Sequence, residues 1–166
     1  MLSNNSLGGS NVNLNIVLFQ PEIPQNTGNI GRTCVLTDSK LHLIKPLGFS
    51  LEEKETRRAG LDYWPYLQLE IHESYEALRE KYKDSTFYFC STKGDKYYHQ
   101  VEFKDGDFLV FGRESSGLPE YIRNENFKNL IKVPMINTTS RSLNLSNTVA
   151  IIAYEALRQL EFPNMK

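Results

Sequence analysis

The sequence predicts an α/β domain with a mostly parallel sheet flanked by helices. Strand-like apolar runs alternate with helix-like segments along the chain, and polar loops containing glycine or several amides follow some of these runs. Because ligands of parallel sheets bind beyond the carboxyl ends of the strands, three such loops predict one composite binding site. A length of 166 residues and a hydrophobic content of 40% suit one domain with one sizeable core.

Each predicted element in the first half has a recognisable boundary. The first strand stops before Pro21, the second before Pro46, and Ser50 is a helix-capping residue type. The expected elements are a strand over residues 14–19, a helix from about 27 to 36, a strand over 41–44 and a helix that begins at Leu51.

The second half continues the alternation. Residues 67–71 alternate as a strand, and residues 86–90 and 108–111 are apolar runs of core-strand length rich in β-formers. The other expected elements are a helix over 74–82, a strand over 130–133 and a last helix over 144–160.

The composition places limits on domain number and compartment. We expect residues 1–13 to be a disordered leader and residues 14–166 to form a single domain. No apolar stretch is long enough for a membrane span, and the leader lacks the features of a signal peptide. The two cysteines, Cys34 and Cys90, have no metal-ligand spacing, which favours a reduced, cytoplasmic protein.

The charge pattern argues against binding of nucleic acid through overall charge, and the histidine pattern argues against metal binding. The formal net charge of −1 does not suit a protein held on nucleic acid by bulk charge. Arg57 and Arg58 form the one tight basic cluster, which is also typical of a solvated helix face. The three histidines are scattered along the chain with no second ligand nearby, so we predict no metal site.

The first polar loop, residues 26–32, contains Asn26, Gly28, Asn29 and Arg32. The predicted helix places Asn29 and Arg32 on one face near its N-terminus, where the helix dipole favours anions and not cations. An arginine there suggests that it grips a phosphate or polarises a hydroxyl. The alternative is a surface arginine in an ordinary salt bridge, with Asn26 as a helix cap.

The second loop begins with Gly112 directly after a buried strand and continues through Glu114 to Gly117 and Pro119. Glycine there allows a ligand to approach the backbone, and Glu114 can hold a loop through backbone amides. A tight turn before a helix that starts at Pro119 is the alternative. The segment matches neither the dinucleotide fingerprint nor the P-loop.

The third loop leads into the last helix through Ser142 and Asn144, either of which can cap it. That helix is apolar around nearly its whole circumference, from Leu145 through Ile151 to Leu160. Such a helix is buried on two sides, which in a small domain favours a twofold dimer.

Together, residues 26–32, 111–119 and 140–147 resemble the three motifs of the SPOUT class of RNA 2′-O-methyltransferases. Residues 15–29 and 57–63 are most similar to small bacterial members that act on the wobble nucleotide of tRNA. The likeness covers nearly all of the chain from residue 14 to 163. It implies a deep trefoil knot in the C-terminal part, which no periodicity could show.

The resemblance implies a cofactor and partners. S-adenosyl-L-methionine would be bound by Cys90, Gly112, Val133 and Ser142, largely through backbone atoms. The resemblance also implies a homodimer. The RNA partner would be the anticodon stem-loop of a tRNA, in particular leucine tRNAs, with Arg57, Arg58 and Tyr154 as contacts.

The resemblance also implies catalytic roles for Arg32, Asn26, Ser142 and Asn144. Because a guanidinium is a poor base, we expect Arg32 to stabilise the developing alkoxide rather than remove its proton. Three alternatives remain: a 2′-O-methyltransferase for another tRNA or ribosomal RNA site, a non-catalytic RNA-binding factor of this fold, and an unrelated nucleotide-binding α/β enzyme.

Overall fold

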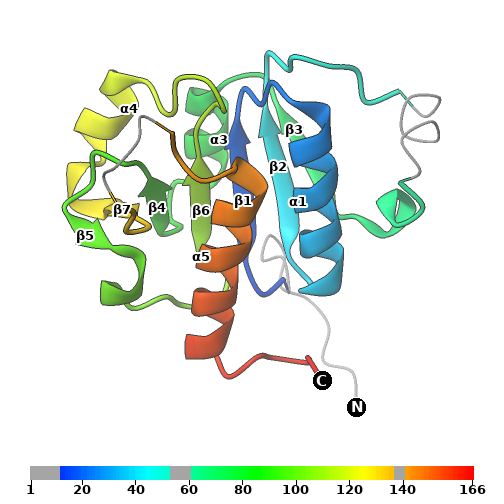
Figure 1. The fold of residues 1–166 in the computed structure, drawn as a ribbon. Helices are drawn as coiled ribbons and strands as arrows, with labels where there is room; N and C mark the ends of the chain where they lie inside the picture. The colour runs from blue at the N-terminus through cyan, green and yellow to red at the C-terminus, as the bar shows by residue number, and fades with distance from the viewer. Residues whose placement is uncertain (1–11, 53–60, 137–140) are drawn as a thin grey trace.

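The computed structural model describes residues 12–52, 61–136 and 141–166. Within these residues, seven strands form one sheet in the order β3-β2-β1-β6-β4-β7-β5, and all neighbouring strands are parallel. The predicted α/β class is confirmed (Figure 1). The elements are β1 (Asn15–Phe19), α1 (Pro24–Leu36), β2 (Lys40–Ile44), β3 (Leu69–His72), α3 (Tyr75–Lys81), β4 (Phe87–Cys90), β5 (Lys96–Tyr97), β6 (Phe108–Phe111), α4 (Glu120–Glu125), β7 (Leu130–Lys132) and α5 (Leu145–Gln159).

Both faces of the sheet are buried, as a parallel sheet requires. Successive side chains of β1 point to opposite faces, so Ile16 and Leu18 join one core, while Val17 and Phe19 join the other. Helices α1 and α5 lie side by side over the first face (Figure 1). Their core residues include Ile30, Cys34, Val149 and Ile152, and α3 and α4 supply Leu78 and Ile122 to the second face.

The first helix begins at Pro24, three residues before the predicted start, because proline is preorganised for the first helical turn. Arg32 therefore lies in the third turn and not near the N-terminus. The predicted position near the helix N-terminus was therefore wrong. Asn29 and Arg32, which were predicted to share a helix face, are both exposed. Asn26 lies inside the helix and does not cap it.

Other boundaries differ from prediction in ways that have physical causes. Strand β5 has only two residues, both exposed, and leaves no periodic signal. Ser50 accepts a hydrogen bond from the backbone N–H of Glu52. Leu51 and Glu52 are not helical, and the rest of the helix expected there lies outside the described residues.

The first two described residues belong to the folded domain, although a leader was expected over residues 1–13. Val12 and Asn13 are buried, and the Asn13 amide donates to the carbonyls of Thr37 and Pro163 at 2.9 and 3.2 Å. None of the helices in the described ranges is both long and apolar enough to cross a bilayer.

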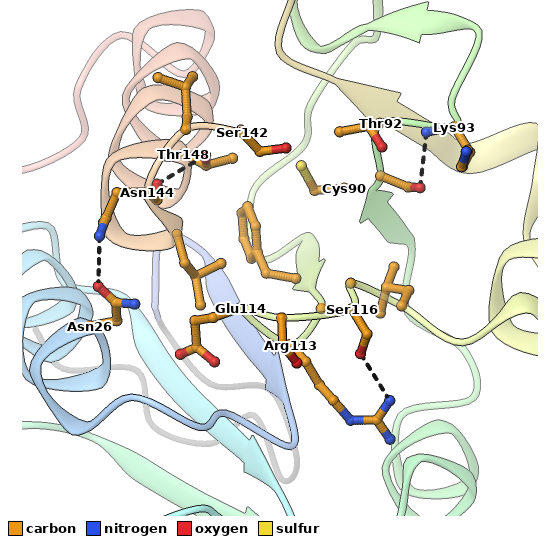
Figure 2. Close-up of a pocket in the computed structure, with 18 of the residues that line it drawn as sticks. Asn26, Cys90, Thr92, Lys93, Arg113, Glu114, Ser116, Ser142, Asn144 and Thr148 are labelled. Carbon is orange, nitrogen blue, oxygen red and sulfur yellow. Dashed lines mark hydrogen bonds between the residues drawn. The ribbon is translucent and has the colours of Figure 1, made fainter. Parts of the chain in front are cut away.

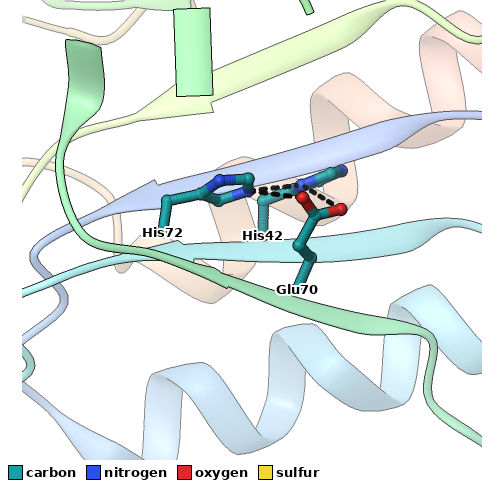
Figure 3. A group of neighbouring side chains, drawn as sticks. All are labelled: His42, Glu70 and His72. Atoms are coloured by element: carbon teal, nitrogen blue, oxygen red, sulfur yellow. Dashed lines mark hydrogen bonds and ion pairs between the residues drawn. The ribbon is translucent and has the colours of Figure 1, made fainter. Parts of the chain in front are cut away.

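Two histidines meet beside β1, contrary to the prediction that the histidines are scattered (Figure 3). Nδ1 of His42 lies 3.0 Å from Nε2 of His72, and the other ring nitrogen of His42 lies 2.8 Å from the Asn15 side-chain oxygen. Thirty residues separate the histidines in sequence. The parallel register pairs His42 with Glu70 and Ile44 with His72, which brings the two rings together.

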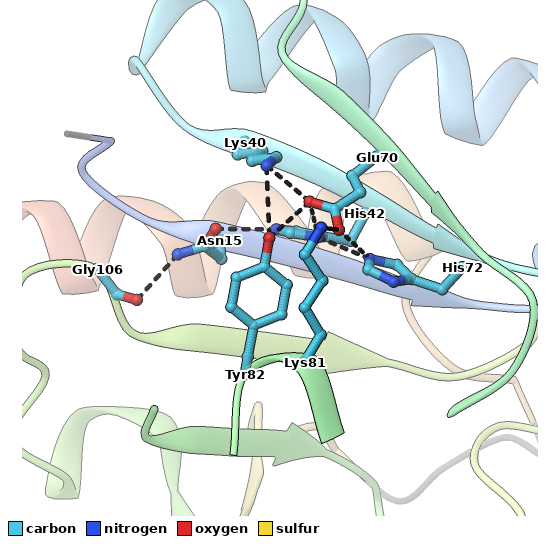
Figure 4. A network of polar contacts seen from close by, with 8 residues as sticks. All are labelled: Asn15, Lys40, His42, Glu70, His72, Lys81, Tyr82 and Gly106. Carbon is cyan, nitrogen blue, oxygen red and sulfur yellow. Dashed lines mark hydrogen bonds and ion pairs between the residues drawn. The ribbon is translucent and has the colours of Figure 1, made fainter. Parts of the chain in front are cut away.

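Glu70 completes this buried polar network (Figure 4). Its carboxylate forms ion pairs with Lys40 and Lys81 and accepts a hydrogen bond from the Tyr82 hydroxyl. These contacts lower the pKa of Glu70 despite its partial burial. The network ties α3 and the chain that follows it to strands β2 and β3.

Candidate functional site

A cavity of about 620 Å³ opens at the carboxyl ends of β4 and β6 (Figure 2). Its walls come from the start of α1, the loop after β4, the loop after β6 and the segment that enters α5. Residues from all three polar loops line this cavity, as the predicted composite site requires, and its use as a binding site stays a prediction.

One wall joins α1 to α5 through two asparagines. Asn144 caps α5 because its side-chain oxygen accepts from the backbone N–H groups of Ser146 and Asn147 at 2.8 and 3.4 Å. Its side-chain nitrogen donates to the side-chain oxygen of Asn26 at 3.0 Å. Both asparagines line the cavity. The capping role predicted for Asn144 is confirmed, and the same side chain also contacts the first motif.

A second wall is a tight glycine turn. The backbones of Arg113 and Gly117 bond to each other, and Gly117 has a φ of +69°, which favours glycine. A Cβ at Gly112 would lie 2.2 Å from the carbonyl carbon of Gly117. Gly112 is therefore needed for the turn itself, a stronger constraint than the ligand approach that the sequence suggested.

Cys90 ends β4 and lines the cavity. Burial raises the pKa of its thiol to about 12. The thiol is therefore neutral and a poor nucleophile.

The structure brings five predicted site residues to one cavity and leaves others outside it. The residues in the cavity lining are Asn26, Cys90, Gly112, Ser142 and Asn144. Val133 is not among the lining residues and instead packs in the core of the first face. Arg57 and Arg58 lie outside the described residues.

Arg32 and Tyr154 also lie outside the cavity lining of the single chain. Both are exposed, on α1 and α5 respectively. The Arg32 guanidinium carbon lies 5.8 Å from the centre of the Tyr63 ring, in a cation–π contact. One chain alone therefore does not place Arg32 at the cavity.

Sequence reasoning missed the basic residues that line the cavity. Their contribution is hidden because acidic residues elsewhere cancel it in the net charge. Three of them stand in or beside the polar loops that follow apolar runs, whereas Arg123 lies within α4 and left no such signal. They are Lys93, Arg113, Arg123 and Arg141.

Among the described residues, one group has the geometry of metal ligands: His42, Glu70 and His72. Burial lowers the pKa of His42 to about 3 and also lowers that of His72, so both rings are neutral and available as ligands. However, two lysines already neutralise Glu70 and would repel a divalent cation. The group is satisfied as a polar network, and the absence of a metal site stays a prediction.

The cavity has the size and the mixed lining of a small-molecule site. Its volume lies in the range of small-molecule sites, roughly 300–1,000 Å³. Apolar surface from Ile23, Leu118 and Leu143 lies beside hydroxyls of Ser91 and Ser142. These groups suit the aromatic and polar parts of S-adenosyl-L-methionine.

Residues 13–154 match the SpoU rRNA Methylase family. The chain belongs to this family. It is 48% identical to a tRNA (cytidine(34)-2′-O)-methyltransferase of Saccharophagus degradans, over 92% of this chain and 99% of that one. It is 45% identical to the enzyme of the same name from Escherichia coli (strain K12), over 90% and 96% of the two chains.

Solved structures agree with this assignment. A structure described as giving insights into the 2-OH methylation of C/U34 on tRNA is 45% identical, has a TM-score of 0.81 and covers 89% of this chain and 96% of its own. An AdoMet-bound rRNA methyltransferase from Sinorhizobium meliloti shares the fold, with a TM-score of 0.79 and 21% identity over 91% of this chain and 58% of its own. The chain therefore has the fold of SpoU methyltransferases, whereas the trefoil knot stays a prediction.

Proposed function

We propose that this chain transfers a methyl group from S-adenosyl-L-methionine to the ribose 2′-hydroxyl of the wobble cytidine or uridine of tRNA. The observation that carries the proposal is the cavity, whose walls are the three motifs in a chain 45–48% identical to tRNA (cytidine(34)-2′-O)-methyltransferases. When bound there, the cofactor supplies an activated methyl group. The chain's own residues must align the ribose hydroxyl and stabilise its developing charge.

The motif residues have distinct roles in this proposal. Asn26 and Asn144 hold the first and third walls together, and Ser142 lies at the cavity with its hydroxyl free to orient a ligand (Figure 2). Arg32 stabilises the alkoxide through its permanent positive charge. The hydroxyl proton leaves to a phosphate or to water.

A homodimer is part of the proposal because Arg32 does not reach the cavity in one chain. The outer surface of α1, α5 and the segments that enter them carries exposed apolar side chains: Ile23, Leu36, Leu143, Ile151 and Tyr154. Exposed apolar surface of this kind is typical of an interface. A twofold dimer that buries this surface would bring Arg32 of one chain next to the cavity of its partner.

RNA contacts complete the proposal. Arg57, Arg58 and Tyr154 are the proposed contacts to the anticodon stem-loop, and the basic residues at the cavity add positive charge near the target ribose. A cytoplasmic location is also proposed, and the tRNA substrate and two free cysteines support it.

The direct test is to incubate the full chain with S-adenosyl-L-methionine and total tRNA from a strain that lacks wobble 2′-O-methylation, then map the modified ribose. We expect methylation at the wobble nucleotide, including that of leucine tRNAs. Methylation at another tRNA position, or only of ribosomal RNA, would support the alternative substrates. Cofactor binding without transfer to any RNA would support a non-catalytic factor.

A further inference from the structure

The carboxylates of Glu22 and Glu114 form hydrogen bonds between the chain that enters α1 and the glycine turn after β6. The Glu114 carboxylate accepts hydrogen bonds from the backbone N–H groups of Glu22 and Ile23 at 2.8 and 3.2 Å. The Glu22 carboxylate accepts from the backbone N–H and the hydroxyl of Ser115 at 3.0 and 2.7 Å. These four residues form a reciprocal contact, here termed the carboxylate clasp.

Arg113 reinforces the clasp from the adjoining position. Its guanidinium donates to the side-chain oxygen of Gln20 and lies 4.9 Å from the centre of the Phe19 ring. Gln20 has a φ of +46°, a conformation that non-glycine residues adopt rarely. The chain leaving β1 is thus held in a defined conformation by the loop that leaves β6.

The clasp lies directly before the residues that build the first wall. Ile23 is the residue before the first turn of α1, and Asn26 follows in that turn. Glu114 and Ser115 belong to the glycine turn that forms the second wall (Figure 2). Asn26 in turn contacts Asn144. Helix α1 is therefore bonded to the second wall through the clasp and to the third wall through Asn26.

The clasp contributes more to the relative position of two loops than to the stability of the whole fold. Hydrogen bonds from Ser115 lower the pKa of the Glu22 carboxyl, so it is ionised at neutral pH and accepts both bonds. Both Glu22 and Ser115 are exposed, and exposed charged contacts contribute little to folding free energy. Four contacts between two loops can still fix how those loops face each other.

We propose that Glu22 is a positioning residue for the methyl transfer: through Ser115 it fixes the spacing between the start of α1 and the glycine turn, and so shapes the cofactor cavity. This inference rests on the proposed function, because it assumes that S-adenosyl-L-methionine occupies the cavity. Glu22 acts without touching cofactor or substrate, since it is not among the residues that line the cavity.

The test compares Glu22→Ala and Glu22→Gln with the wild type in three measurements. Hydrogen exchange of the ligand-free chain measures how readily residues 112–118 open. Calorimetry measures the affinity of the cavity for S-adenosylhomocysteine. Methyl transfer gives kcat and KM for the cofactor. We expect Glu22→Ala to exchange faster in residues 112–118 and to bind S-adenosylhomocysteine about 10-fold more weakly. We expect Glu22→Gln, which keeps a neutral acceptor for Ser115, to lie within about 3-fold of wild type.

The matched control is Glu102→Ala. Glu102 is also an exposed glutamate with one charged partner, Lys104, but it lies before β6, at the opposite end of the sheet from the cavity. We expect wild-type behaviour in all three measurements and a Tm within about 2 °C of wild type for both alanine variants.

Distinct outcomes overturn the proposal. Wild-type exchange and affinity in Glu22→Ala would show that the clasp does not shape the cavity. A large fall in Tm with unchanged affinity would make Glu22 a structural brace only. If the wild-type chain bound no S-adenosylhomocysteine, the proposed function would fail, while the exchange measurement would still decide whether Glu22 orders the glycine turn.

Discussion

At the scale of single residues, the sequence indicated polar groups better than it indicated their partners. Asn26, Gly112, Ser142 and Asn144 could be selected because they follow apolar strands, and all four line the cavity. Glu114 was expected to hold a loop through backbone amides, and it does so by accepting from the N–H groups of Glu22 and Ile23. Which residues supply these N–H groups could not be predicted, because every residue except proline carries one. The side-chain direction of a long, exposed residue such as Arg32 is also not encoded by its spacing.

Arg32→Lys tests the proposed electrostatic role. Lysine keeps the positive charge but loses the planar fork of the guanidinium and its contact with the Tyr63 ring. We expect kcat to fall about 100-fold while the affinity for S-adenosylhomocysteine is unchanged. Steady-state methyl transfer and calorimetry measure the two quantities, and near-normal turnover would refute the role.

Gly112→Ala tests the glycine turn. The added Cβ would lie 2.2 Å from the Gly117 backbone, so the turn must open. We expect a loss of about 1–3 kcal/mol in the free energy of unfolding, measured by denaturant titration, and weaker cofactor binding. Gly106→Ala is the control: its φ of +78° makes alanine strained, but open space surrounds it. That variant should lose stability and keep its cofactor affinity.

At the scale of elements, boundaries with side-chain caps were predicted within one residue. Ser74 caps α3 and Asn144 caps α5, each by accepting backbone N–H groups of the first turn. The start of α1 was missed because Ile23 makes no side-chain cap. Its N–H is instead bonded by Glu114, which is 91 residues away in sequence.

Asn144→Asp separates the two functions of that side chain. Aspartate still caps α5 and suits the positive end of the helix dipole. It cannot donate to the Asn26 oxygen, which lies 3.0 Å from the Asn144 amide nitrogen. We expect a Tm close to wild type and methyl transfer reduced about 10-fold or more. Equal activity would mean that the contact between the two asparagines is not needed.

At the scale of the whole molecule, the order of the strands was beyond sequence reasoning. Alternation of strands and helices predicts a parallel sheet, but it does not reveal that β6 lies between β1 and β4. Because alternation does not reveal which strands are neighbours, the pairing of β2 with β3 could not be predicted. The contact between His42 and His72, which depends on that pairing, could not be predicted either.

Stability should fall as the pH drops from 7 to 5. Burial, neighbouring His72 and the ammonium of Lys40 lower the pKa of folded His42 from 6.5 to about 3, although Glu70 opposes this. Between these values the unfolded chain binds a proton that the folded chain does not, so stability decreases with falling pH. His42 alone should account for a loss of about 2 kcal/mol at pH 5, and His72, whose pKa is also lowered, adds to it; denaturant titration measures the sum.

A variant of His42 tests whether this residue causes the pH dependence of stability. Glu70 has a lowered pKa, so its contribution is fully present above its ordinary value of 4.5 and does not affect this window. His42→Asn should flatten the slope between pH 7 and 5, whatever its effect on absolute stability.

Ile151→Asp tests the proposed dimer. Ile151 is 36% exposed on the outer face of α5, so a carboxylate there is tolerated in a single chain but not in an apolar interface. We expect sedimentation to show a monomer and methyl transfer to be lost. Phe127→Asp, at a 62% exposed position before β7, should remain a dimer. A monomeric wild type with full activity would contradict the dimer.

The bond between Asn13 and the carbonyl of Pro163 holds the two ends of the domain together. A short peptide could therefore connect residue 166 to residue 12, and new ends could be opened at the exposed turn of Lys83 and Asp84. Such a circular permutant would keep every strand neighbour of the sheet. It would move the free end away from the C-terminal segment, so its refolding rate would test whether the predicted knot makes threading of that end a slow step.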